Sequence, residues 1–313
     1  MAKRPWEVGF FRSMQEQGYY PESREAGMAD QVGVQGLIGV LGGLRYMVAT
    51  FLELRAFAYW EPPPEWDPLA ETYRMINLLQ PRSEASWETA AWHMAYNASA
   101  DALHKREDLT QLQREAWSED YIERGEAILK KGLQWNPGSL SLLDELARLY
   151  QYKKKDYCQA AEVYRQASLL PEGAGFYYRF YGYTLAKCAG KEKEAYGVLR
   201  DIYDQGREIL QEGGPLLWKP TLIVEMNRLE GELGVPWKER IPERFDPKTF
   251  RIASPLQGER SYPAYRNVFL QQREEGIDDP MVPRIVEMLE ERLSIPEEER
   301  VFPRAAESDS EEE

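Results

Sequence analysis

The chain has 313 residues, of which 53 are acidic and 39 are basic, so its formal net charge at pH 7 is −14. This balance argues against nucleic acid as a partner, because nucleic-acid binding depends on a basic surface that neutralises phosphates. Hydrophobic residues make up 43% and aromatic residues 12% of the chain, which is enough for a packed core and excludes a wholly disordered protein.

The N-terminal part is predicted to be an irregular arm followed by a long helix. Residues 1–34 are largely polar and contain no secretory signal. A helix is predicted from Gln35 to Trp60, because apolar residues recur at helical spacing until a run of three prolines. The apolar segment from Val32 to Leu54 is uninterrupted only from Gly36 to Leu44, whereas a bilayer span needs about 20 apolar residues. A buried helix is favoured, and an interfacial helix is the alternative.

Further helices follow along most of the chain. In order, they are predicted over residues 68–80, 83–104, 119–134, 142–152, 157–170, 176–188, 192–210, 216–233, 265–275 and 280–293. The charged stretch 105–118 either lengthens its neighbouring helices or forms a loop. Residues 236–263 are rich in proline and are predicted as a meander. No convincing strand is found, so the predicted fold class is all-α.

One spacing recurs through these helices: a small or apolar residue, an aromatic or apolar residue four positions later, a small or apolar residue three later, and then a proline. Its occurrences are Leu69-Tyr73-Ile76-Pro81, Gly125-Leu129-Gly132-Pro137 and Ala160-Tyr164-Ala167-Pro171. A repeated helix that ends at a proline is typical of stacked helical hairpins, which form an extended solenoid.

The third hairpin resembles the tetratricopeptide repeat (TPR) consensus. The matching residues are Leu143, Leu146, Ala147 and Tyr150 in its first helix, and Ala160, Tyr164, Ala167 and Pro171 in its second. The strings LGGLRYMVATFLELRA, YRMINLLQP, AWHMAYNAS and ILKKGLQWNP look like a family of uncharacterised bacterial TPR proteins, many of which look membrane-anchored. The resemblance implies a right-handed α-α superhelix of about four repeats. It implies no activity.

Four regions are therefore expected. They are an irregular arm (1–34), a TPR-like solenoid with a closing helix (35–234), a meander with C-terminal helices (235–306) and an acidic tail, ESDSEEE (307–313). A block of acidic residues repels itself and remains solvated, so the tail is expected to be disordered.

Few residues indicate chemistry. His93 and His104, with Asp101 nearby, offer at most a weak metal site, and ordinary surface or core histidines are favoured. Cys158 and Cys188 form no CxxC motif; a bridge between them is conceivable, but two buried thiols in a reducing compartment are favoured. No nucleophile with an adjacent base or phosphate-binding loop is found, so we expect no catalytic activity, metal or cofactor.

In TPR proteins, the first helix of each hairpin lines the concave face. Carried onto this chain, the resemblance implies groove residues Glu88, Trp92 and Tyr96 in the second repeat, Asp144, Arg148 and Tyr152 in the third, and Arg179, Tyr183 and Lys187 in the fourth. Aromatic anchors and arginines suit peptide binding. The alternative is that Trp92 and Tyr96 pack against a neighbouring helix.

These patterns favour a cytoplasmic protein-interaction scaffold that binds a protein or peptide segment in its groove. The alternative function is a structural or assembly component of a bacterial envelope complex, held at the inner membrane by the apolar segment 32–54. Membrane association is possible under this view but is not favoured.

Overall fold

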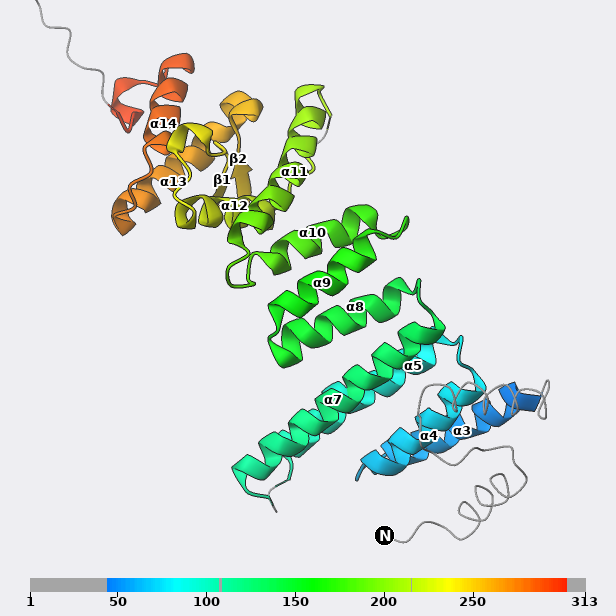
Figure 1. The fold of residues 1–313 in the computed structure, drawn as a ribbon. Helices are drawn as coiled ribbons and strands as arrows, with labels where there is room; N and C mark the ends of the chain where they lie inside the picture. The colour runs from blue at the N-terminus through cyan, green and yellow to red at the C-terminus, as the bar shows by residue number, and fades with distance from the viewer. Residues whose placement is uncertain (1–43, 107–108, 215, 303–313) are drawn as a thin grey trace, which may run out of the picture. The chain divides into compact units, whose positions relative to one another are not determined.

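The computed structural model describes residues 44–106, 109–214 and 216–302. Helices dominate these residues, in agreement with the predicted fold class (Figure 1). The chain divides into two compact units, the first ending at Asp156 and the second beginning at Tyr157. This boundary separates the two helices of the third predicted hairpin. The predicted arm, the start of the first helix and the acidic tail lie outside the described residues.

The first unit contains helices joined by short connections, and most agree with the predicted ranges. They are α3 (Leu44–Trp60), α4 (Trp66–Leu79), α5 (Glu84–Trp92), the π-helical η1 (His93–Ala98), α6 (Ser99–His104), α7 (Gln111–Trp135), α8 (Leu140–Arg148) and the π-helical η2 (Leu149–Lys154).

The charged stretch before α7 mainly lengthens that helix. A capping box starts the helix at Thr110, whose backbone N–H donates to Gln113 Oε1 at 3.0 Å while its hydroxyl accepts from the Gln113 N–H. This local hydrogen bonding starts the helix at Gln111, eight residues before the predicted start at Glu119.

The first unit depends on a close approach between α7 and the α5–η1 segment. A Cβ placed on Gly125 of α7 would lie 2.6 Å from the Ala95 Cβ, and one placed on Gly132 would lie 2.9 Å from the Trp87 ring. Any larger residue at either position would push the helices apart. The repeated small residues of the sequence pattern therefore mark real helix contacts in this unit.

The second unit has more varied elements. They are α9 (Tyr157–Ser168), α10 (Ala174–Leu185), α11 (Glu192–Gln211), α12 (Pro220–Glu232), η3 (Trp237–Glu239), β1 (Arg244–Asp246), β2 (Arg251–Ala253), η4 (Pro255–Ser261), α13 (Tyr262–Glu275), α14 (Met281–Arg292) and η5 (Glu297–Glu299). In the ranges 44–106, 109–214 and 216–302, no helix combines the length and apolarity that a membrane crossing requires.

The prediction that the chain contains no strand is wrong in one place. Strands β1 and β2 form an antiparallel hairpin in which Phe245 pairs with Ile252. Buried Asp246 organises its turn, accepting hydrogen bonds from the Lys248 N–H at 2.9 Å and the Thr249 hydroxyl at 2.6 Å. Strands of three residues are too short to show alternation, so the sequence pattern could not reveal them.

A helix-ending motif occurs twice in the second unit. After α12, buried Glu230 accepts the Ile241 N–H at 2.8 Å; after α14, buried Glu290 accepts the Val301 N–H at 2.7 Å. In both copies an arginine four residues after a turn proline donates back to the carbonyl of the residue before that proline: Arg240 to Val235 and Arg300 to Ile295. The sequence signal is the pattern LE-x2-L-[GS]-[VI]-P-x2-ER-[VI], which both copies share.

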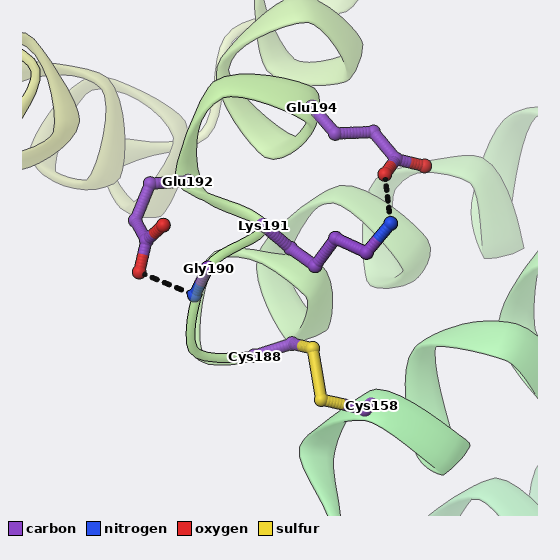
Figure 2. The surroundings of a disulfide bond; sticks show 6 residues. All are labelled: Cys158, Cys188, Gly190, Lys191, Glu192 and Glu194. Atoms are coloured by element: carbon purple, nitrogen blue, oxygen red, sulfur yellow. Dashed lines mark hydrogen bonds and ion pairs between the residues drawn. A yellow bond between two sulfur atoms is a disulfide. The ribbon is translucent and has the colours of Figure 1, made fainter.

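Cys158 and Cys188 form a disulfide, so the prediction of two free thiols is wrong (Figure 2). Cys158 lies in the first turn of α9, and Cys188 follows the end of α10. These helices pack against each other, which brings the two Cα atoms to 4.9 Å. With only two cysteines and no recognisable spacing, the sequence favoured free thiols. The bridge forms because α9 packs against α10 and brings the two cysteines together.

We expect the disulfide to stabilise the second unit. It joins residues separated by 30 positions, and the loop entropy removed from the unfolded chain corresponds to about 3–4 kcal/mol. A Cys158→Ser, Cys188→Ser double variant should lower the urea midpoint of this unit, and dithiothreitol should reproduce the loss in the wild type but not in the variant. Full alkylation of both cysteines in the native, unreduced protein would contradict the bridge.

Candidate functional site

Two neighbouring helices carry the predicted groove residues of the first unit. The α5–η1–α6 segment runs without a break from Glu84 to His104, and α8 continues directly into η2. Helix α5 packs against α8. Both segments change from α- to π-helical hydrogen bonding partway along. Such π-helical turns inside α-helices are frequent at functional sites, and nothing in the sequence pattern indicated them.

The predicted residues form a surface that we call the helix-A face, made of Glu88, Trp92, Tyr96, Asp144, Arg148 and Tyr152. Trp92 is 46% and Tyr152 is 56% exposed, which is high for aromatic side chains. Tyr96 and Glu88 are half-buried. The face therefore presents aromatic surface next to partly desolvated polar groups.

The electrostatic character of this face is acidic. Burial raises the pKa of Glu88, and the nearby Glu145, Glu84 and Asp144 raise it further. Glu88 Oε1 is shielded from solvent and has no hydrogen-bond partner among the described residues. Burial also raises the pKa of Glu145. Two carboxyl groups in this unit are thus held where their ionised forms are poorly solvated.

Tyr96 is subject to the same environment. Burial raises its pKa to about 12; Glu145 contributes in the same direction, and Arg148 opposes it. The ammonium of Lys153, on η2, lies 4.9 Å from the centre of the Tyr96 ring and donates to Ser99 Oγ at 3.2 Å. Lys153 thereby joins η2 to the η1–α6 segment. Sequence reasoning assigned this lysine only to a turn.

Arg148 is engaged on its own helix. Its Nε donates to Asp144 Oδ2 at 2.7 Å, four residues earlier. Arginine and aspartate at this spacing are adjacent on a helix surface. The sequence named both residues, but the pairing means that Arg148 does not reach the face as an uncompensated cation.

Trp92 and the adjacent His93 belong to an aromatic cluster. The Trp60 ring lies 6.2 Å from Trp92 and 4.8 Å from His93, and Tyr73 lies 5.5 Å from His93. Burial lowers the pKa of His93 to about 4, so the imidazole is neutral at pH 7. Trp92 therefore contacts Trp60 of the neighbouring helix α3, as one of the two alternatives expects, and remains partly exposed.

The histidines do not form a metal centre with nearby acids. Across the three described ranges, no group of three His, Cys, Asp or Glu side chains is close enough to hold a metal ion. His104 is exposed on α6, whereas His93 is buried in the aromatic cluster.

The remaining predicted residues lie in the second unit. Arg179 and Tyr183 are on α10, and Lys187 follows this helix. Burial raises the pKa of Tyr183, whose hydroxyl has no partner among the described residues. The Lys187 ammonium lies 5.7 Å from the centre of the Tyr157 ring. Arg179 and Tyr183 thus lie together on α10, whereas Lys187 lies beyond its end and contacts Tyr157 of α9.

Comparison with protein-family models, curated proteins and solved structures finds no match to this chain.

The raised pKa of Glu88 predicts a stability effect with a definite sign. Folded Glu88 binds its proton more tightly than unfolded Glu88, so its ionisation lowers stability as pH rises above the ordinary value of 4.5. Glu88→Gln should therefore stabilise the protein at pH 7, by about 0.5 kcal/mol after allowance for solvent screening, and the gain should vanish near about pH 4. Urea unfolding at both pH values measures it.

Glu119→Gln serves as the control, because Glu119 is an exposed acid on α7. Its effect on stability should be the same at both pH values. A destabilisation by Glu88→Gln that is larger at neutral pH would show that the Glu88 carboxylate is favourably solvated in the folded protein.

Proposed function

We propose that the protein is an interaction scaffold, whose first unit binds a segment of a partner protein at the helix-A face. The observation that carries this proposal is the exposure of Trp92 and Tyr152 on adjacent helices, next to the partly desolvated Glu88. Rigid aromatic side chains contribute large contact areas at low entropic cost, which is why they anchor protein interfaces.

The proposal includes a TPR-like right-handed solenoid with a concave groove. It is supported by the packed helix pairs and by the close contacts that Gly125 and Gly132 permit. It is also supported by the resemblance of Leu143, Leu146 and Ala147, all buried on α8, to the repeat consensus.

The charges of the face favour a basic partner segment. Glu88 Oε1 has no hydrogen-bond partner among the described residues, and Arg148 is already paired with Asp144. A lysine or arginine of the partner placed beside the half-buried Glu88 side chain would lower the cost of its ionisation. We therefore propose a segment with a basic residue flanked by apolar residues that contact Trp92 and Tyr152. The proposed function is binding alone, and no catalytic activity is proposed.

Photo-crosslinking tests this function. With p-benzoylphenylalanine in place of Tyr152, we expect a discrete adduct with one partner; the same group at Gln134, exposed on α7, is the matched control and should give none. Glu88→Gln should reduce the adduct about tenfold, since it removes the charge that attracts the basic residue of the partner. Equal adducts from positions 152 and 134 would place binding elsewhere.

The disulfide bears on location. Disulfides persist in oxidising compartments and are rare where thiols are kept reduced. The bridge between Cys158 and Cys188 thus supports an extracytoplasmic site of action over the cytoplasmic one that the sequence predicts. Crosslinking is accordingly carried out in intact cells, where both compartments are sampled.

A second function is favoured by one observation on α3. Large apolar side chains are exposed along this helix: Phe51 is 66% and Leu54 65% exposed, and Met47 and Phe57 are exposed to a similar extent. This stripe could lie in a membrane interface and hold an envelope component at the bilayer. Met47, Phe51 and Leu54 belong to the apolar segment 32–54, of which residues 32–43 lie outside the described residues.

Vesicle flotation tests this second function. If it holds, the full-length chain floats with phosphatidylglycerol–phosphatidylethanolamine vesicles. Phe51→Ser, Leu54→Ser should then lower the bound fraction at least about tenfold, because two large side chains no longer leave water. Leu169→Ser, at a 72% exposed position of the second unit, should change nothing. Wild-type protein that stays with the unbound fraction would rule out this function.

A further inference from the structure

The first unit contains a cavity of about 350 Å³ between the α3–α4 connection and the η1–α6 segment. Two tryptophans, Trp60 and Trp66, and prolines of the connection line one side; Asn97, Asp101 and Lys105 lie on the other. Its volume is at the lower end of the range for ligand pockets, about 300–1,000 Å³. It therefore suits a small ligand or a single side chain.

The two indoles form a fixed corner of this cavity. Their ring centres are 5.6 Å apart and their planes meet at 59°. Trp60 is held in place by the buried His93 ring at 4.8 Å, and Trp66 is 9% exposed. Indole faces are a favourable surface for a cation or for the methylene chain that carries it.

Asp101 supplies a negative charge in the same cavity. Trp66 Nε1 donates to its Oδ2 at 2.9 Å, which orients the carboxylate. The side chain is only 14% exposed, yet within the described ranges the one ion pair of its Oδ1 is with the Lys105 ammonium at 3.4 Å. Charge-assisted N–H···O bonds are shorter, about 2.7–2.9 Å. Lys105 is 76% exposed, so it reaches the carboxylate from solvent and holds it loosely.

We propose that this cavity binds a primary alkylammonium group. The ammonium donates to Asp101 Oδ1, and its aliphatic stem lies against Trp60 and Trp66. Lys105 is then an internal competitor that the ligand displaces. A quaternary ammonium is disfavoured because it has no N–H to donate to the carboxylate. The site is distinct from the helix-A face, so it stands or falls independently of partner binding there.

The ammonium could belong to a lysine side chain or to a free amine, and matched probes separate the two. Nα-acetyl-lysine methylamide and n-butylammonium are titrated into full-length, ¹⁵N-tryptophan-labelled protein, with the indole N–H signal of Trp66 as the readout. Tighter binding of the lysine probe identifies a lysine-bearing chain as the source; equal binding identifies a free amine. Nα-acetyl-norleucine methylamide, which lacks the ammonium, should bind at least about tenfold more weakly.

Two variants test the assigned roles. Asp101→Asn retains an acceptor for Trp66 but removes the charge, and should weaken amine binding about tenfold. Lys105→Gln removes the competitor at an exposed position and should tighten it about threefold. Glu71→Gln is the control: Glu71 is an exposed acid on α4 paired with Arg74, and its loss should leave affinity unchanged.

Equal binding of the norleucine and lysine probes would overturn the proposal, as would the absence of any shift at Trp66. Lys105→Gln supplies a test that does not depend on the fold of the Asp101 variant. If Lys105→Gln leaves amine affinity unchanged or weakens it, Lys105 does not compete for Asp101 and the proposed site is wrong.

Discussion

The close approach of α7 to the α5–η1 segment is the constraint on which the first unit depends. Gly125 and Gly132 allow it because neither carries a side chain where Ala95 and Trp87 must pack. This contact fixes the continuous α5–η1–α6 segment. Trp92 and Tyr96 on that segment belong to the helix-A face, whereas Asp101 lies in the cavity beside Trp66. One rigid element thus positions both proposed binding sites.

Each proposed site contains a carboxylate that is partly removed from water and has few hydrogen-bond partners. Glu88 has a shielded oxygen without a donor, and Asp101 is held by one indole N–H and a loosely placed lysine. At Glu88, whose pKa is raised by burial, ionisation costs stability unless a cation reaches the carboxylate. A net charge of −14 favours association with basic groups over a distance, and these two carboxylates are where we propose that a cation binds.

The second unit is held together by contacts between segments that are distant in sequence. Its helix ends are closed by buried glutamates, Glu230 and Glu290, which accept backbone N–H groups that would otherwise be unpaired. The disulfide joins α9 to the end of α10 near the start of this unit. Both features act through tertiary contacts between segments 11 to 30 residues apart, so single-helix periodicity does not reveal them.

The sequence by itself determined the helical class and most helix boundaries. Prolines that end helices and small residues at a fixed spacing are local signals. Helix α4 ends just before Pro81, and Gly132 lies at a close helix contact, as the pattern predicts. Tertiary structure decided what depends on distant neighbours. It paired Cys158 with Cys188, engaged Arg148 with Asp144, placed Trp66 against Asp101 and raised the pKa of Glu88. The pKa, exposure and partners of a side chain depend on how helices pack against one another. The sequence pattern shows only which residues can take part in that packing.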